Sequence, residues 1–229
     1  MTTTLQIERH KLITTASLSK AMATRIRGAL ADRRPDEVLL HHHDGDGSMI
    51  YLYPRVQYKV INQQAVVLAL EEGIEAARQA LAGLTAVTLA GTEIAIGRIE
   101  SIFAEEPFGW GEEMIEYRFL TPWVALNQEN ARRFAACNPS EARALLCKIL
   151  IGNCLSMAKS FHYDVPGRIR ADIHPRQMPV AMKGMNLLGF VGRFRLNFHL
   201  PDWTGLGKSV SRGFGTVQRI RPREERPCN

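Results

Sequence analysis

Three adjacent histidines followed by an aspartate, His41-His42-His43-Asp44, form the only cluster of side chains in this sequence that titrate near neutral pH. If this stretch is extended, His41 and His43 point to one face and His42 to the other. Two imidazoles on one face can share the work of RNA cleavage: one takes the proton of a 2′-hydroxyl, and the other protonates the 5′-oxygen that leaves. Such a reaction needs neither metal nor cofactor and ends in a 2′,3′-cyclic phosphate.

The same cluster is compatible with two other roles. Two histidines and a carboxylate can hold zinc or manganese, although only His41 and His43 share a face and no second ligand cluster of recognisable spacing is present. A solvated polar turn without catalytic value is the other alternative. A calcium loop is excluded, because Met49 replaces its glycine and Arg55 replaces its bidentate glutamate.

A cation must lie near the reacting phosphate to offset the negative charge that gathers during attack. Arg55 and Lys59 follow the histidines in the sequence and are the candidates for this role. We therefore expect the segment after the histidine turn to pass close to the phosphate.

A second segment rich in phosphate-binding residue types runs from Gly205 to Gly215 and reads Gly-Leu-Gly-Lys-Ser-Val-Ser-Arg-Gly-Phe-Gly. Glycines let backbone amides approach a polyanion closely. A nucleotide-binding P-loop is excluded, because Asp202 occupies the position of its first glycine and no helical pattern follows. A glycine-rich hairpin with a basic rim is the plainer alternative.

Further basic residues stand beside aromatic residues or glycines in the second half of the chain. Such mixtures can track a phosphate backbone and stack unpaired bases, although a half-buried strand shows the same alternation. They are Arg168 and Arg170; Lys183; Arg193 and Arg195 around Phe194; and Arg219 and Arg221.

Charge and composition agree with these segments. The 229 residues include 29 Lys and Arg against 23 Asp and Glu, and the net charge of +6 suits a polyanionic partner. The four cysteines contain no C-x-x-C pair, which indicates a reduced, intracellular chain. The N-terminus lacks the regions of a signal peptide, and no apolar run is long enough to span a membrane, so we expect a cytoplasmic protein.

Hydrophobic periodicity predicts the elements that position these segments. The first hundred residues predict a strand over 4–13, a helix from 17 to 30, extended chain over 49–61, a strand over 65–70, a helix over 71–81 and a strand over 92–104. The second half predicts a strand over 114–119, a helix over 129–136 and a long helix that begins at Asn138-Pro139, followed by strands and hairpins from 165.

This order of elements predicts an α+β protein made of two tandem ferredoxin-like (βαββαβ) modules. The first, over residues 1–106, carries the histidines after its first helix. The second, over residues 107–229, is expected to be a degenerate copy that ends in the C-terminal glycine-rich loop.

Together the motifs resemble the CRISPR-associated endoribonucleases that cut precursor CRISPR RNA within its repeats, and specifically the b subtype of that family. The likeness extends from about Leu40 to Val217, and the order and spacing of the motifs make it specific. The segments that carry it are His41–Asp44 leading to Tyr53–Lys59, Phe119–Asn127, Ile149–Met157, and Pro201-Asp202 running into the glycine-rich loop.

The resemblance implies roles for individual residues. The family's pair of catalytic histidines, separated by one residue, maps onto His41 and His43, and a shift of one in register would promote His42 instead. From its residue type and position, and not from the resemblance, Lys59 is a further catalytic candidate, and Arg168 and Arg170 are candidates for contacts with RNA on the same ground. RNA-binding roles are implied for Gly205, Gly207, Lys208, Ser209, Arg212, Gly213 and Gly215.

The resemblance also implies a metal-independent reaction without a cofactor, in which CRISPR repeat RNA is cut by 2′-hydroxyl attack to give a 2′,3′-cyclic phosphate and a 5′-hydroxyl. The crRNA product could then stay with the protein in an effector complex, whose other subunits, or a second copy of this chain, are candidate partners. The alternative is a non-catalytic RNA-binding subunit of such a complex.

Overall fold

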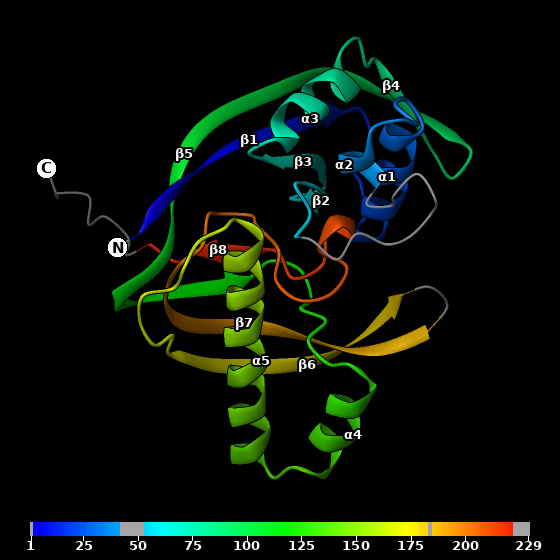
Figure 1. Cartoon of the computed structure of the whole chain (residues 1–229). Coiled ribbons are helices and arrows are strands. Elements are labelled where there is room, and N and C mark those ends of the chain that lie inside the picture. The colour runs from blue at the N-terminus through cyan, green and yellow to red at the C-terminus, as the bar shows by residue number, and fades with distance from the viewer. Residues whose placement is uncertain (1, 42–52, 183–184, 222–229) are drawn as a thin grey trace, which may run out of the picture.

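The computed structural model describes residues 2–41, 53–182 and 185–221 (Figure 1). The first half contains β1 (Thr3–Thr14), the 3-10 turn η1 (Lys20–Met22), α1 (Ala23–Ala31), α2 (Val38–His41), β2 (Val56–Ile61), β3 (Gln64–Leu70), α3 (Gly73–Leu81) and β4 (Ala86–Leu89). The long strand β5 (Thr92–Phe119) follows. The second half contains α4 (Gln128–Ala136), α5 (Pro139–Ser160), β6 (Ala171–Met182), β7 (Met185–His199), the 3-10 turn η2 (Val210–Arg212) and β8 (Val217–Arg219).

The fold is a mixed α/β fold around an antiparallel sheet. Its strands pair in the order β2-β3-β1-β5-β7-β6, and β4 and β8 also pair with β5. In Figure 1, β5 curves around one side of the molecule and joins the upper half to the lower half. Its first part pairs with β1 and its last part with β7 and β8, so this single strand holds the two halves together.

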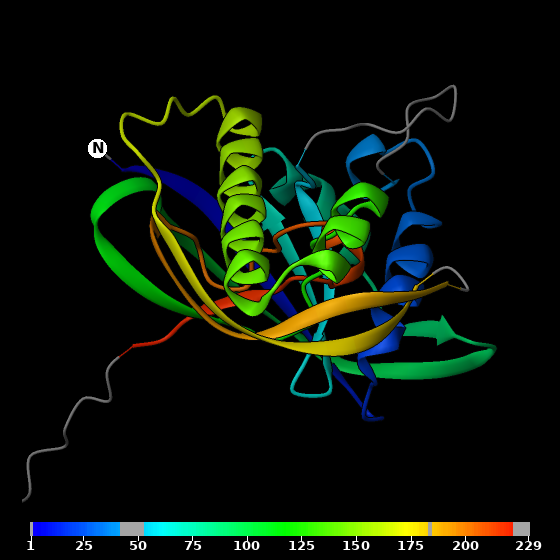
Figure 2. The ribbon, with the colours of Figure 1, turned by 90° about the horizontal axis from the view of Figure 1, so that it is seen from below.

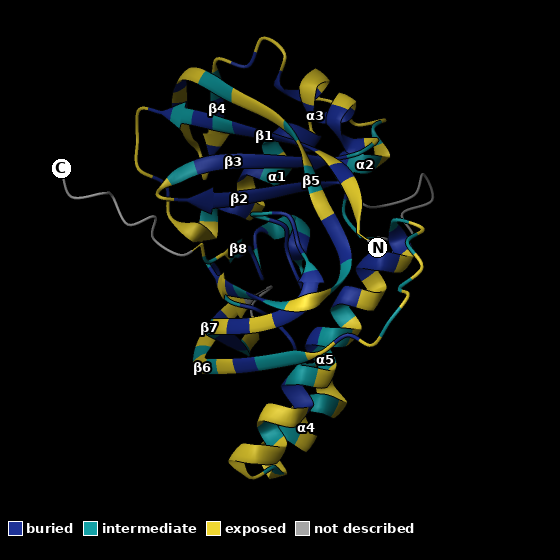
Figure 3. Cartoon of the chain, turned by 90° about the vertical axis from the view of Figure 1, so that its left-hand side faces the viewer, coloured by how far each residue is buried: buried dark blue, intermediate teal, exposed yellow. Residues whose placement is uncertain are grey.

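In the first half, α1 and α3 cover one face of the sheet formed by β2, β3 and β1. The opposite face is also covered, because Gln57 of β2 accepts a hydrogen bond from the amide of Gly205 in the glycine-rich loop. β2 is buried along its whole length and β3 from its second residue onward, as Figure 3 shows. Burial on both faces explains why β3 consists largely of Val, Leu and Ala.

In the second half, α5 packs against one face of the sheet formed by β5, β7 and β6 (Figure 2). The helix begins where the sequence predicts. The Asn138 side chain accepts a hydrogen bond from the amide of Glu141, the Glu141 carboxylate accepts one from the amide of Asn138, and Pro139 is the first helical residue. Leu150, Cys154 and Met157 of this helix are buried in the core, and this part of the prediction is confirmed.

Two predicted elements differ from the structure. The strands predicted over 92–104 and 114–119 are one continuous strand, because residues 111–114 are absorbed as an irregularity in the pairing with β7 between Trp110 and Ile115. The approach to the histidines is a helical turn, and the carboxylate of Glu37 accepts a hydrogen bond from the amide of Leu39 in that turn. Of the helices in the described residues, none combines the length and the apolar character needed to cross a membrane.

Candidate functional site

His41 is the last residue of α2 and is half-buried. Its Nε2 lies 3.2 Å from the backbone carbonyl oxygen of Arg34. Its own backbone carbonyl oxygen accepts a hydrogen bond from the guanidinium of Arg27. Because His41 ends a helix, the expected alternation of side chains along a strand does not apply to it. Alternation therefore gives no reason to place the side chains of His41 and His43 on one face. His42 and His43 themselves lie outside the described residues.

Arg27 connects the end of α2 to the glycine-rich loop. Ala23 and Arg27 are one helical turn apart, so they share a face of α1, and α1 packs against η2. Gly213, directly after η2, lies against this face, since a Cβ atom added to it would come within 3.0 Å of the Ala23 Cβ. The two segments that the sequence singles out for chemistry therefore meet at α1, although they lie near opposite ends of the chain.

Arg27 and Arg212 form a pair of like charges in this contact. Burial lowers the pKa of Arg27, and the neighbouring charge of Arg212 lowers it further. Neither guanidinium makes an ion pair with a carboxylate of the described residues. An anion would relieve this repulsion, and a guanidinium offers donors that match phosphate oxygens. The sequence marks Arg27 only as a cation on a polar helix face, because its contacts with His41 and the loop are tertiary.

Lys59 lies inside the protein. The residue is 0% exposed, and its Nζ lies 3.3 Å from the Oγ1 of Thr216, at the end of the glycine-rich loop. Burial lowers the pKa of its ammonium to about 7. This position corrects the expectation that Lys59 offers its charge to a phosphate at the surface, because the loop covers the face of β2 from which its side chain extends.

Arg55 is likewise committed to contacts within the protein. Its guanidinium donates to the backbone carbonyl oxygen of Ser160 and to the carboxylate of Glu72, both at 2.5 Å. It also lies 3.9 Å from the centre of the Phe161 ring. Arg55 therefore ties the first half of the chain to the end of α5, and this corrects the expectation that it faces a phosphate.

The glycines of the loop serve its packing against the rest of the protein. The amide of Gly215 donates to the carbonyl oxygen of Pro122 at 2.8 Å. Gly215 has a φ of 63°, and a Cβ atom there would lie 1.9 Å from the carbonyl oxygen of Leu206. The expectation that the loop amides face a polyanion is therefore wrong for the amides that already donate within the protein, which are those of Gly205, Leu206, Lys208, Arg212, Gly213, Phe214 and Gly215.

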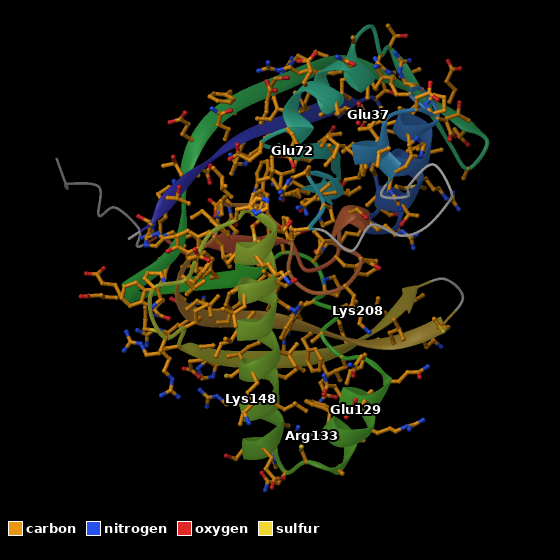
Figure 4. All side chains as sticks on the ribbon, in the orientation of Figure 1. Glu37, Glu72, Glu129, Arg133, Lys148 and Lys208 are labelled. Carbon is orange, nitrogen blue, oxygen red and sulfur yellow. The ribbon has the colours of Figure 1, made fainter. Side chains whose placement is uncertain are left out.

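The polar side chains of the loop face outward. Lys208 is exposed, and Ser209 and Arg212 are half-buried. In the view of Figure 4, Lys208 lies between α2 above and α4 below. The described loop contains only the three-residue turn η2 and no α-helix, which agrees with the exclusion of a P-loop.

Arg168 and Arg170 do not join this site. They belong to the segment between α5 and β6, which lies on the opposite side of the molecule from α1 and α2 in both Figure 1 and Figure 2. The guanidinium of Arg170 donates to the backbone carbonyl oxygen of Glu112, and the backbone carbonyl oxygen of Arg168 accepts from the Trp110 indole at 3.1 Å. Any contact that they make with RNA must involve a different part of the ligand.

Comparison with known proteins places the chain in a family. The family model of the Cas6b N-terminal domain matches residues 3–102, and that of the Cas6b C-terminal domain matches residues 109–220. An uncharacterized protein of Methanocaldococcus jannaschii is 40% identical over 116 residues, which is 50% of this chain and 79% of that protein.

Solved structures agree with these matches. A crystal structure of Cas6b has a TM-score of 0.90 and 28% sequence identity, covering 95% of this chain and 100% of the other. A second, described as the CRISPR RNA processing endoribonuclease Cas6b, has a TM-score of 0.76 and 27% identity, covering 94% of this chain and 100% of the other. The fold is also similar to that of Csf5, a type IV Cas6 crRNA endonuclease, at a TM-score of 0.63 and 13% identity over 96% and 100% of the two chains. The chain belongs to the Cas6b family.

Proposed function

We propose that this chain is a metal-independent endoribonuclease that cleaves CRISPR repeat RNA in precursor transcripts. The observation that carries the proposal is the match, along nearly the whole chain, to a solved structure described as a CRISPR RNA processing endoribonuclease. The hydrogen bond from Arg27 to the backbone carbonyl oxygen of His41 supports the same function, because it brings a residue that carries an acid–base group close to Arg27 and Arg212, which make no ion pair with the described residues.

The strand order supports the finer assignment of two tandem ferredoxin-like modules. The strand order is β5-β1-β3-β2 in the first half and β8-β5-β7-β6 in the second, with β5 counted in both halves and the short strand β4 left out. In each order the first and third strands of the half, taken along the chain, lie at the centre and pair with each other. The second module would be degenerate, because the connection from β7 to β8 is the glycine-rich loop in place of a helix. We place the boundary between residues 106 and 107, within β5.

In the proposed reaction, His41 and His43 act on the two oxygens that change partners. One imidazole removes the proton of the 2′-hydroxyl, whose oxygen then attacks the adjacent phosphorus. The bond from phosphorus to the 5′-oxygen breaks, and the other histidine protonates that oxygen. The products are a 2′,3′-cyclic phosphate and a 5′-hydroxyl. The reaction changes no oxidation state, and the proposed mechanism uses no metal or cofactor.

We assign to Arg27 the cationic role for which Arg55 and Lys59 are unavailable. Among the described residues, its guanidinium is the charged group that donates a hydrogen bond to the backbone carbonyl oxygen of His41, and it lies beside Arg212. Placed there, the two guanidiniums would bind the non-bridging oxygens of the scissile phosphate and stabilise the charge that develops on them. Lys208 and Ser209 would hold neighbouring phosphates through their side chains, and the loop glycines would fix the shape of this surface.

The decisive experiment incubates labelled repeat RNA with the protein in excess chelator. Cleavage that yields a 2′,3′-cyclic phosphate is expected. RNA that is bound but stays intact would favour the alternative of a non-catalytic RNA-binding subunit, and a requirement for added divalent metal would refute the mechanism. Replacing the scissile 2′-hydroxyl by hydrogen should stop cleavage and preserve binding, because the nucleophile is removed while the phosphates remain.

The partners proposed besides RNA are the other subunits of an effector complex and a second copy of this chain, and both stay predictions.

A further inference from the structure

A hollow of about 690 Å³ lies over strands β5, β6, β7 and β8. Residues Arg118 and Arg193 alternate along their strands with Tyr117, Phe119 and Phe194, which are buried in the core, so the hollow opens on the face opposite the core. None of its lining residues comes from α1, α2 or the loop 205–215. We call it the arginine hollow, after Arg118, Arg176, Arg193, Arg219 and Arg221, which line it together with the single carboxylate of Asp202.

Like charges stand directly opposite each other in this sheet. Arg118 of β5 pairs with Arg193 of β7. Like charges in directly opposed positions of an antiparallel sheet are destabilising. The neighbouring row, Glu116, Arg195 and Asp172, alternates in charge. The paired positions of the sheet therefore carry opposite charges one row away but like charges in the row of Arg118 and Arg193, as expected if an external anion supplies the compensation there.

The internal partners of these arginines are weak. Arg193 lies 3.5 Å from Glu116 and Arg221 lies 3.7 Å from Asp202, with 67% and 80% of the two arginine side chains exposed. Ion pairs this exposed contribute little. The guanidinium of Arg118 donates to the neutral amide oxygen of Gln218, which carries no charge to compensate that of the arginine. The guanidiniums of Arg176 and Arg219 make no hydrogen bond or ion pair with the described residues.

The chemistry of the lining indicates the ligand. All five cations are arginines, whose planar donors match two phosphate oxygens at once. Arg118, Arg193 and Arg176 lie on the adjacent strands β5, β7 and β6, which are about 4.8 Å apart, and Arg219 and Arg221 lie at and beyond the end of β8, so they can follow several phosphates in succession. The one aromatic residue in the lining, Phe119, is buried in the core and offers no surface on which a base could stack.

We propose that the arginine hollow binds the phosphate backbone of single-stranded RNA at a distance from the cleaved bond, without reading its bases. The inference rests on the proposed function, since it supplies a second anchor for the transcript that the site at His41 cuts. Binding here would raise affinity and hold the RNA after cleavage, while leaving the chemical step unchanged.

The test compares the double variant Arg118→Gln/Arg193→Gln with the charge-matched control Arg132→Gln/Arg133→Gln on α4, where Arg133 is marked in Figure 4. The probe is repeat RNA with a 2′-deoxy scissile nucleotide, and fluorescence anisotropy gives the affinity at several salt concentrations. We expect the first variant to bind about tenfold more weakly. Its salt slope should become shallower by about 1.4 units, at about 0.7 for each phosphate that the protein no longer neutralises. The control should keep the wild-type slope.

Two further measurements locate the effect. Cleavage at saturating RNA should proceed at the wild-type rate, and an oligouridylate should lose affinity by the same factor as the repeat. A slope equal to that of the control, a loss restricted to the repeat, or a slower step at saturation would each overturn the proposal. If the wild-type protein binds RNA but does not cut it, the proposed cleavage fails and the binding test still decides on the hollow. Thermal unfolding checks the fold, and Arg193→Gln alone repeats the test if the double variant is unstable.

Discussion

The Nζ of Lys59 lies 3.3 Å from the Oγ1 of Thr216, so a side chain of edge strand β2 ends beneath the glycine-rich loop. The Thr216 hydroxyl in turn lies 3.3 Å from the carbonyl oxygen of Gly213. A titratable group is thus built into the contact that seats the glycine-rich loop on the first half of the chain. The stability of the whole fold should depend on its charge.

Stability should rise with pH above neutrality. Burial lowers the pKa of Lys59 from 10.5 to about 7, so between these values the unfolded chain binds a proton that the folded chain does not. The free energy of unfolding therefore increases with pH across that window. Lys59→Met should remove this increase and raise stability at pH 6 by a few kcal/mol, since one pKa unit corresponds to about 1.4 kcal/mol.

Urea unfolding between pH 6 and 9 measures this effect. The pH range stops at 9, below the pH at which tyrosines of the unfolded chain ionise. Burial raises the pKa values of Tyr53, Tyr58 and Tyr117 in the folded protein, so at higher pH these groups would lower the free energy of unfolding. Lys148→Met, an exposed lysine on α5, is the control and should leave the pH dependence unchanged. Equal slopes for wild type and Lys59→Met would contradict the assignment.

The burial of Lys59 illustrates what sequence alone does not show. Along β2, Val56, Tyr58 and Val60 alternate with Gln57 and Lys59, a pattern typical of a strand with one face in water. The glycine-rich loop covers that polar face from the other end of the chain. The pattern identifies the strand correctly, whereas a contact between segments so far apart has no local signal.

Local signals explain which predictions succeed. The start of α5 is correct because Asn138, Pro139 and Glu141 encode it within four residues. The turn at α2 is missed because it spans only four residues, and its hydrogen bonds, such as that from the Leu39 amide to the Glu37 carboxylate, leave no periodic pattern in the sequence. The contact between Arg27 and His41 joins two helices, so it could be found only after folding.

The proposed histidine pair makes a direct prediction for activity. His41→Ala combined with His43→Ala should slow cleavage by on the order of 10²-fold or more, because neither proton transfer then has a side chain to perform it. His42→Ala is the matched control in the same run of histidines and should cleave near the wild-type rate. Single-turnover cleavage of repeat RNA gives the three rates, and a loss confined to His42→Ala would shift the register of the pair by one residue.

Lys208 and Arg212 should act mainly on binding. Replacing either by Ala should weaken RNA binding and make the salt dependence shallower by about 0.7 units for each phosphate whose charge is no longer neutralised. Lys148→Ala, which removes one exposed charge from α5, should leave the slope unchanged. Titrations at several salt concentrations measure these slopes. A slope that stays at the wild-type value in both loop variants would mean that these side chains do not touch phosphate.

Arg27 should act on the chemical step. Arg27→Ala is expected to lower the cleavage rate at saturating RNA by about 10²-fold, because the guanidinium that would stabilise the developing charge is removed. Arg27→Lys should recover part of that rate, since it keeps the charge but not the planar pair of donors. Added guanidinium should restore activity to Arg27→Ala, an outcome that a purely structural role would not produce.

Arg25→Ala is the control for Arg27→Ala. Arg25 is an exposed arginine on the same helix, and Arg25→Ala removes the same charge without touching His41 or the loop. It should cleave at the wild-type rate. If Arg27→Ala instead raises KM with an unchanged rate at saturation, the guanidinium binds substrate and transition state equally well. Its place would then be on a neighbouring phosphate, and the cation at the scissile phosphate would have to come from Arg212.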